Sequence, residues 1–152
     1  MKVRLITVLL LCFGLICCAS APAPKQIVSS FSIDKPYDAT WSALIEVFAE
    51  LQLPIQNMEK DSGLILTDWI DFTGQDNTGY CDCGGLGINI EVNRLGKFNV
   101  FVKKTGDNSC DIKVNTQYQQ TYKFGDDLYK RNCVSTGKLE AEIYNRIKEK
   151  VV

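Results

Sequence analysis

Cysteine is the most reactive residue type in this chain of 152 residues, which holds seven cysteines and no histidine. Because histidine is absent, the Ser-His and Cys-His systems that activate hydrolase nucleophiles are excluded. Cys12, Cys17 and Cys18 lie within or directly after an apolar N-terminal run, far from the other cysteines. The sequence therefore predicts no catalytic residue, a protein that is not an enzyme, and two groups of cysteines with separate roles.

The N-terminus has the pattern of an export signal. Lys2 and Arg4 form a short positive start, and residues 5–16 are an almost unbroken apolar run. A run of about twelve apolar residues is typical of a signal peptide and is about eight residues short of a membrane-spanning helix. We predict a lipoprotein signal peptide over residues 1–17, with ordinary secretion after cleavage near residues 19–21 as the alternative.

Cys18 has the surroundings of a lipidated cysteine. Leu15 is the aliphatic residue and Cys17 the small residue that a bacterial lipobox has before its cysteine. We predict that Cys18 becomes the first residue of the mature protein and carries diacylglycerol and an amide-linked chain such as palmitate, because stable anchoring needs two or more chains. Ala19 follows Cys18, which favours sorting to the outer membrane, periplasmic face. Residues 18–26 then form a lipidated tether.

The net charge of the mature chain limits its partners. Removal of the signal peptide deletes two of the 17 basic residues, so that 15 basic residues face 18 acidic ones and the net charge is −3 (15 − 18). This balance argues against nucleic acid, which is bound through basic side chains on phosphates. It also argues against adsorption to anionic lipid through protein charge. We expect attachment to the membrane through the N-terminal lipid, an envelope protein as partner, no nucleic acid and no cofactor.

The remaining four cysteines predict two disulfides, since an even number in an exported chain is typical of paired thiols. A bond between Cys81 and Cys83 would close a very tight ring, so each should pair with Cys110 or Cys133, and the sequence leaves both pairings open. A zinc site is the alternative, but C-x-C is not the usual knuckle spacing and histidine ligands are missing. A redox role would need a low-pKa thiol in a motif that this sequence lacks. We predict no metal ion.

Two pairs of carboxylates were candidates for hydrolysis. Asp68 and Asp71 fall on opposite faces of an expected strand, and Asp126–Asp127 lies in a polar loop, so we interpret both pairs as solvated surface rather than as paired acids. Residues 84–87 (Gly-Gly-Leu-Gly) resemble part of a phosphate loop, but no Lys-Ser/Thr and no helix follow them.

Aromatic residues near the chain's later cysteines indicate a possible partner surface. They are interleaved with glutamines and lysines, a composition that suits an exposed polar-aromatic face. The alternative is that half of them belong to the core and the rest are scattered. The residues are Tyr118, Tyr122, Phe124 and Tyr129.

The apolar pattern predicts a strand at residues 27–33 and then a helix that Asp34–Pro36 opens and Pro54 ends. Proline suits the first turn of a helix. The apolar residues of this expected helix recur at helical spacing and form one stripe that we assign to the core. The stripe consists of Trp41, Leu44, Ile45, Phe48 and Leu51.

The rest of the chain is read mostly as strands. A hairpin is expected from residues 55–59 and 64–72, and a long loop from residues 73–87. Residues alternate as in half-buried strands over three further segments, 88–93, 98–103 and 112–118, with turns at Gly96 and residues 106–108. A final helix carries Leu139, Ile143, Ile147 and Val151 on one stripe. The fold class is α+β, with both helices on one face of an antiparallel sheet in a single domain, 27–152.

At residues 36–44, 53–55 and 61–65 the chain resembles the domain opening of BamC/NlpB-type outer-membrane lipoproteins, with an early Trp41 in the helix and an Asp-Ser-Gly-Leu-Ile turn. The resemblance implies a helix-grip fold, in which a long C-terminal helix lies against a curved antiparallel sheet, and a link to outer-membrane protein assembly. The family has a long N-terminal segment and two such domains, whereas this chain has one. Only the lipidated Cys18 carries over as a functional residue.

Two functions are compatible with the sequence. The first is a non-enzymatic envelope lipoprotein that acts as a binding or scaffolding module. The alternative is a periplasm-facing carrier of a lipid or other apolar ligand held between sheet and helix, which requires a cavity there. Large side chains expected to fill that space argue against the carrier: Trp69, Phe98, Phe101 and Tyr118.

Overall fold

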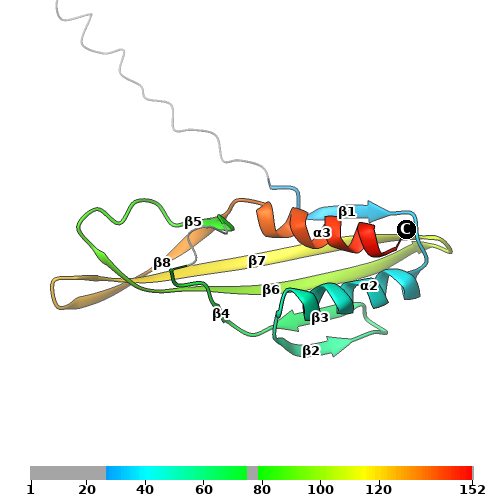
Figure 1. Cartoon of the computed structure of the whole chain (residues 1–152), viewed down its shortest axis with the longest axis horizontal. Coiled ribbons are helices and arrows are strands. Elements are labelled where there is room, and N and C mark those ends of the chain that lie inside the picture. The colour runs from blue at the N-terminus through cyan, green and yellow to red at the C-terminus, as the bar shows by residue number, and fades with distance from the viewer. Residues whose placement is uncertain (1–26, 75–78, 152) are drawn as a thin grey trace, which may run out of the picture.

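The structure is a computed structural model that describes residues 27–74 and 79–151. The signal peptide, Cys18 and the tether lie outside the described residues. The fold is α+β, an open antiparallel sheet of eight strands with two helices (Figure 1). In chain order the elements are β1 (Ser30–Ile33), α2 (Tyr37–Glu50), β2 (Ile55–Glu59), β3 (Leu64–Thr67), β4 (Ile70–Asp71), β5 (Cys81–Asp82), β6 (Ile90–Gly106), β7 (Ser109–Phe124), β8 (Asp127–Ser135) and α3 (Lys138–Lys150).

A long hairpin of β6 and β7 runs the length of the molecule. The strands pair from Gly106↔Ser109 to Ile90↔Lys123. One edge of the hairpin carries β4 and β3, with β2 beyond β3. The other edge carries β1 beside residues 110–113 and then β8 beside residues 118–124. Every other strand is therefore placed by its position along β6 and β7.

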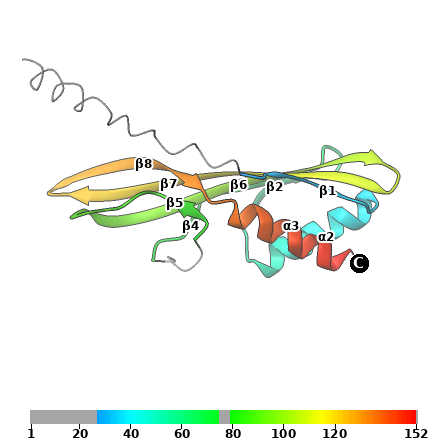
Figure 2. The same ribbon diagram turned by 90° about the horizontal axis from the view of Figure 1, so that it is seen from above.

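The sheet has two regions that differ in what covers it. Both helices lie on one face, over the part that includes β1, β2 and β3, which we call the helix-covered half (Figure 2). Beyond the helices project β5, β8 and the outer parts of β6 (90–95) and β7 (119–124), which we call the arm. Neither of the helices that the structure describes packs on the arm.

The core lies between the two helices and the inner face of the sheet. Each helix buries an apolar stripe, because its apolar residues recur at the spacing of one helical face. Full burial of each such side chain contributes roughly 1.5–3 kcal/mol. The predicted stripes are confirmed for Trp41, Leu44 and Phe48 in α2 and for Leu139, Ile143 and Ile147 in α3 with Val151 directly after it, all at most 8% exposed.

Three aromatic rings fill the inner end of the core. Phe72, Phe98 and Tyr118 are each at most 8% exposed, and their ring centroids lie 6.0 to 6.4 Å apart. The expectation that Phe98 and Tyr118 fill the space under the helices is confirmed. It is wrong for Trp69 and Phe101, which are 41% and 37% exposed.

Gly96 does not form the turn that the sequence predicted. It lies within β6, so that the two expected strands around it are one strand of 17 residues. A Cβ atom at this position would lie 2.7 Å from the Phe72 ring and 3.0 Å from the Tyr118 ring. Glycine is therefore required here because two aromatic rings pack onto the strand backbone.

Most of the arm consists of β8, which the sequence did not predict, and of an end of β7 that extends beyond its predicted length. β7 continues to Phe124, six residues past its expected end at residue 118, and β8 (Asp127–Ser135) was not predicted. The alternation of β8 is weak because its residues are mostly polar and its apolar side chains face solvent, Leu128 at 64% and Val134 at 65% exposed. Gly125, with φ of 59°, makes the tight turn between the two strands.

Buried Glu140 joins the helix-covered half to the arm. This first-turn residue of α3 is 2% exposed. Its Oε1 accepts hydrogen bonds from the hydroxyls of Thr116 (2.8 Å) and Ser135 (2.7 Å). One carboxylate thus connects α3, β7 and β8.

The described chain enters the fold at this same junction. Ser29 accepts a hydrogen bond from the backbone N–H of Val114 (2.8 Å), midway along β7. The side chain of Ile27 lies beside Gly137, where a Cβ atom would be 3.1 Å from the Cγ2 of Ile27. The described chain therefore begins near the middle of the domain rather than at either end.

Candidate functional site

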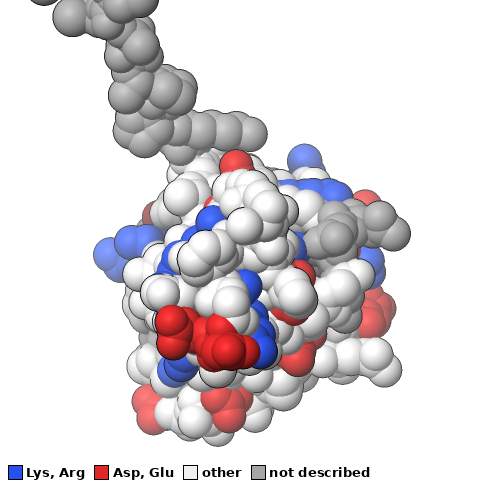
Figure 3. Space-filling model, turned by 90° about the vertical axis from the view of Figure 1, so that its left-hand side faces the viewer, with Lys and Arg blue, Asp and Glu red and all other residues white. Residues whose placement is uncertain are grey.

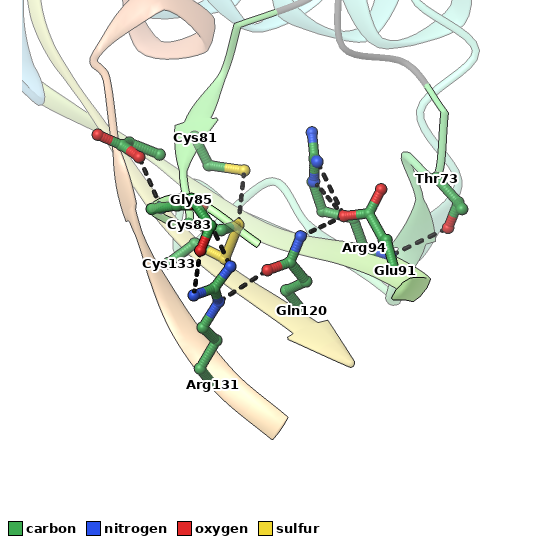
Figure 4. The surroundings of a disulfide bond; sticks show 11 residues. Thr73, Cys81, Cys83, Gly85, Glu91, Arg94, Gln120, Arg131 and Cys133 are labelled. Atoms are coloured by element: carbon green, nitrogen blue, oxygen red, sulfur yellow. Dashed lines mark hydrogen bonds and ion pairs between the residues drawn. A yellow bond between two sulfur atoms is a disulfide. The ribbon is translucent and has the colours of Figure 1, made fainter. Parts of the chain in front are cut away.

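The base of the arm holds three cysteines close together (Figure 4). β5 pairs with the end of β8 through Cys81↔Ser135 and Asp82↔Val134, which places Cys83 directly opposite Cys133. Cys83 and Cys133 form a disulfide, with their Cα atoms 4.3 Å apart. This pair is one of those that the sequence left open.

The prediction of two disulfides is wrong for Cys81 and Cys110, which are free thiols. Cys110 lies opposite Ile33 of β1 in the helix-covered half, where it is buried with its Sγ 3.6 Å from the carbonyl oxygen of Lys35. The other three cysteines of the described residues lie in the arm. Cysteine number and spacing did not reveal that the fold separates Cys110 from every partner.

Cys81 lies against the disulfide. Its Sγ is 3.9 Å from the Sγ of Cys83, and the three sulfur atoms of Cys81, Cys83 and Cys133 all lie within 4.8 Å of one another. Burial raises the pKa of the Cys81 thiol, which the Arg94 guanidinium lowers in part and the carboxylates of Glu91 and Asp82 raise further. While two of the sulfurs are bonded to each other, Cys81 alone offers a thiol to a metal ion.

A polar network next to the disulfide fixes the segment between β5 and β6. Arg131 donates to the carbonyl oxygens of Gly84 (Nη2, 3.1 Å) and Gly85 (Nη1, 3.4 Å), and its Nε donates to Oε1 of Gln120 (2.7 Å). Gln120, 1% exposed, in turn donates to Glu91. The network thus holds the glycine segment against the arm (Figure 4).

The carboxylate of Glu91 ends this network on β6. It accepts from Nε of Arg94 at 3.0 Å and forms an ion pair with Nη2 of the same residue at 2.8 Å. Sequence reasoning missed the contact between buried Gln120 and half-buried Glu91, because nothing local in the sequence distinguishes them from solvated residues of a strand.

The predicted aromatic surface is partly core. Tyr118 is 3% exposed, so its assignment to a partner surface is wrong. It faces the core because Gly96 lets its ring pack against β6, and burial, together with the Glu140 carboxylate, raises the pKa of its hydroxyl. Tyr122, Phe124 and Tyr129 remain on the arm and line a shallow hollow of about 290 Å³ with Asn89.

Aromatic contacts order this part of the arm. The rings of Tyr122 and Tyr129 stack at 5.7 Å, and the guanidinium of Arg131 lies 5.1 Å from the centre of the Tyr122 ring. Phe124 is 52% exposed. The same arginine therefore supports both the aromatic surface and the polar network.

Further apolar side chains are exposed around the arm. Seen from the end of the molecule at which the β7–β8 turn lies, the surface is mostly uncharged, with a group of acidic residues beside basic ones (Figure 3). The exposed apolar residues of the arm and the segment leading into it are Ile88 at 86%, Ile90 at 68%, Val92 at 46%, Leu128 at 64% and Val134 at 65%. Such a concentration on one projection is typical of a protein-binding surface.

The candidate carboxylate pairs are not brought together. Asp68 caps its own turn, accepting from the backbone N–H of Trp69 at 2.7 Å. Asp71 accepts from both the hydroxyl and the N–H of Thr73, which holds the pKa of its carboxyl below the usual range. Asp126 and Asp127 are exposed at the β7–β8 turn. Asp68 and Asp71 therefore have local roles, and Asp126 and Asp127 face solvent.

Comparison with known proteins assigns no family. No protein-family model matches the chain, and no curated protein is significantly similar to it. Among residues 27–74 and 79–151, no helix has the length and apolar character that crossing a membrane requires. The function must therefore be inferred from the chain's own residues.

Proposed function

We propose that this chain is a non-enzymatic lipoprotein of the bacterial outer membrane that uses its arm to bind an envelope protein. The single observation that carries the proposal is the exposed apolar and aromatic surface of the arm. We call these exposed side chains the arm surface: Phe124 and Tyr129 on the face of the sheet that carries the helices, Ile90 and Leu128 on the opposite face, and Ile88 in the segment before β6. The export signal and Cys18 supply the proposed location at the periplasmic face of the membrane.

The arm surface lies apart from the side chains that stabilise the domain. The core is complete under the helices, where the rings of Phe72, Phe98 and Tyr118 fill the space that a carrier would need for a ligand. Nothing in the described part of the chain therefore favours the carrier. Phe124 and Leu128, at 52% and 64% exposed, are available for a partner instead.

An extended segment of a partner protein would suit the geometry of the arm. β5 pairs only with Val134 and Ser135, so within the described residues the rest of β8 has β7 on one edge and no strand on the other. A partner strand could add to this edge through backbone hydrogen bonds, while apolar side chains contact the arm surface. Asp126 and Asp127 at the turn would favour basic residues in that segment.

The likeness to BamC/NlpB-type lipoproteins remains part of the proposal. Two helices on one face of an antiparallel sheet are consistent with a helix-grip domain, although α3 has only 13 residues against 14 in α2. A partner from the outer-membrane assembly machinery is what the likeness favours.

Photocrosslinking tests the binding proposal. A benzoylphenylalanine placed at Leu128 should give discrete crosslinked products in cells, and the same probe at Met58, 48% exposed on β2, serves as the matched control. Ile90→Ser combined with the probe at Leu128 should reduce the product several-fold, because both side chains lie on the same face of the arm. Equal products from both positions would contradict the proposal, and isolation of assembly components in the Leu128 product would support the assembly link.

Cell fractionation tests the anchor separately. Cys18→Ala removes the only thiol that the lipobox pattern selects, and the mature domain has a net charge of −3 (15 − 18), which gives no electrostatic attraction to anionic lipid. We expect the variant to leave the membrane fraction. Retention in that fraction would contradict the lipoprotein assignment.

A further inference from the structure

The base of the arm contains three neighbouring sulfur atoms, of which only two are bonded. Cys81 and Cys83 are two residues apart on an extended segment, so their side chains point to the same face. Cys133 lies directly across from Cys83, and Cys81 is its diagonal neighbour. A free thiol thus lies 3.9 Å from one sulfur of an existing disulfide.

We propose that Cys81, Cys83 and Cys133 form a thiol–disulfide exchange site in which Cys81 replaces Cys83 as the partner of Cys133. The Cys81 thiol loses its proton to solvent, and its sulfur attacks the Sγ of Cys133. The bond between Cys83 and Cys133 breaks, and its electron pair leaves on the Sγ of Cys83, which takes up a proton. One thiol and one disulfide are present before and after, so no external oxidant or reductant is consumed.

The exchange requires β5 to move along β8. Diagonal neighbours on antiparallel strands have Cα atoms about 7–8 Å apart, and a disulfide spans at most about 7 Å without backbone movement. A slip of two residues would place Cys81 directly opposite Cys133 and keep every side chain on its own face. β5 consists of only Cys81 and Asp82. The slip must also break the hydrogen bonds that Thr136 donates to the carbonyl oxygens of Gly79 and Tyr80, just before β5.

Arg131 holds the register that the structure shows. Its guanidinium donates to the carbonyl oxygens of Gly84 and Gly85, directly after Cys83. A slip of two residues carries these carbonyls about 7 Å along the strand, out of reach of the guanidinium. Arg131 therefore favours the Cys83–Cys133 isomer, and the exchange would move the segment that leads into the arm surface. This inference does not depend on the proposed function.

Disulfide mapping of the purified mature protein tests the proposal. The protein is incubated at about pH 8.5, near the ordinary thiol pKa, quenched with acid and labelled with N-ethylmaleimide. Peptide fragmentation then locates the label. We expect label on Cys81 in one population and on Cys83 in another. Label on Cys81 without label on Cys83 at all incubation times would overturn the proposal, and label on Cys133 would overturn the proposed pairing.

Two variants give independent readouts. After treatment with oxidised glutathione, Cys83→Ser should form a bond between Cys81 and Cys133, seen as the loss of two hydrogens by mass. Glutathione on both thiols of this variant would overturn the proposal. Arg131→Ala in the otherwise unchanged chain should raise the Cys81–Cys133 fraction several-fold, and an unchanged fraction would overturn the role of Arg131. Cys81→Ser is the matched control, in which only the Cys83–Cys133 bond can form.

Discussion

Between Phe98 and Val102, β6 lies under two helices, whereas between Ile90 and Leu95 the same strand has no helix above it (Figure 2). In the helix-covered half the strand buries Phe98, Val100 and Val102 at 2% exposure or less. In the arm, the most buried side chain is the amide of Gln120, at 1%. The layer of helices therefore stabilises the helix-covered half through apolar burial, whereas the arm depends on a disulfide and hydrogen bonds.

The largest expected effect is in the helix-covered half. Phe48→Ala removes a ring that is 0% exposed, and we expect a loss of about 3–5 kcal/mol in the free energy of unfolding. Denaturant unfolding followed by fluorescence measures it. Phe124→Ala, in the arm at 52% exposure, is the control and should change stability by less than about 0.5 kcal/mol. Equal losses would remove the distinction between the regions.

Loss of the disulfide should act mainly on the arm. Cys133→Ser breaks a bond between residues 50 apart in sequence and leaves Cys81 no substitute partner, so the cost is up to about 4 kcal/mol on the chain-entropy model. Hydrogen exchange should accelerate over residues 83–95 and much less in α2. Cys110→Ser is the control cysteine variant. Uniform acceleration in both regions would show that the arm is not a separate unit.

The junction between the two regions should show an intermediate effect. Glu140→Ala leaves the half-buried hydroxyls of Thr116 and Ser135 without their acceptor, and we expect a loss of about 1–3 kcal/mol. Thermal unfolding measures it, with Glu149→Ala on the exposed face of the same helix as control. If both variants unfold alike, the buried carboxylate does not couple α3 to the strands.

The polar network of the arm should contribute less to the free energy of unfolding. Gln120→Leu removes the amide that joins Arg131 to Glu91, at a cost of about 1 kcal/mol. Hydrogen exchange should rise at residues 84–91 and stay unchanged in the helix-covered half. Gln117→Leu is the control, since it lies exposed on the same strand. An effect spread over both regions would contradict a local role.

The smallest effect concerns pH. Burial, together with the hydrogen bond to Glu142, raises the pKa of Tyr80 from 10.0 to about 12. Because the raised pKa belongs to the folded state, the protonated Tyr80 hydroxyl stabilises the fold fully below pH 10.0. This contribution to the free energy of unfolding is lost as the pH rises through about 12. The midpoint temperature of thermal unfolding should therefore fall more steeply across this pH range for the wild type than for Tyr80→Phe. Parallel curves would contradict the prediction.

Sequence patterns predicted the helix-covered half better than the arm, and for a physical reason. Helices that pack on a sheet must repeat apolar residues at helical spacing, so Leu44, Phe48 and Ile143 could be assigned to the core. The arm buries polar side chains and exposes apolar ones, the reverse of the usual strand pattern. For this reason β8 was missed.

The candidate site was predicted only in part. The sequence marked the cysteines, but the register of β5 on β8 decides which of them meet, and two-residue strands leave almost no local signal. Gly96 gave a turn signal because a glycine required by packed rings cannot be told from a turn glycine in sequence. The network of Gln120 and Arg131 depends on tertiary contacts alone.

The point at which the chain enters the fold has a mechanical consequence. Ser29 is bonded to Val114 near the middle of β7, beside the junction that Glu140 joins. If the chain is attached to a membrane through the segment before Ser29, as we propose, the arm and the helix-covered half lie on opposite sides of the attachment point. Force from a partner on the arm would then act as torque on the β6–β7 hairpin, and the load would fall first on the contacts at the junction.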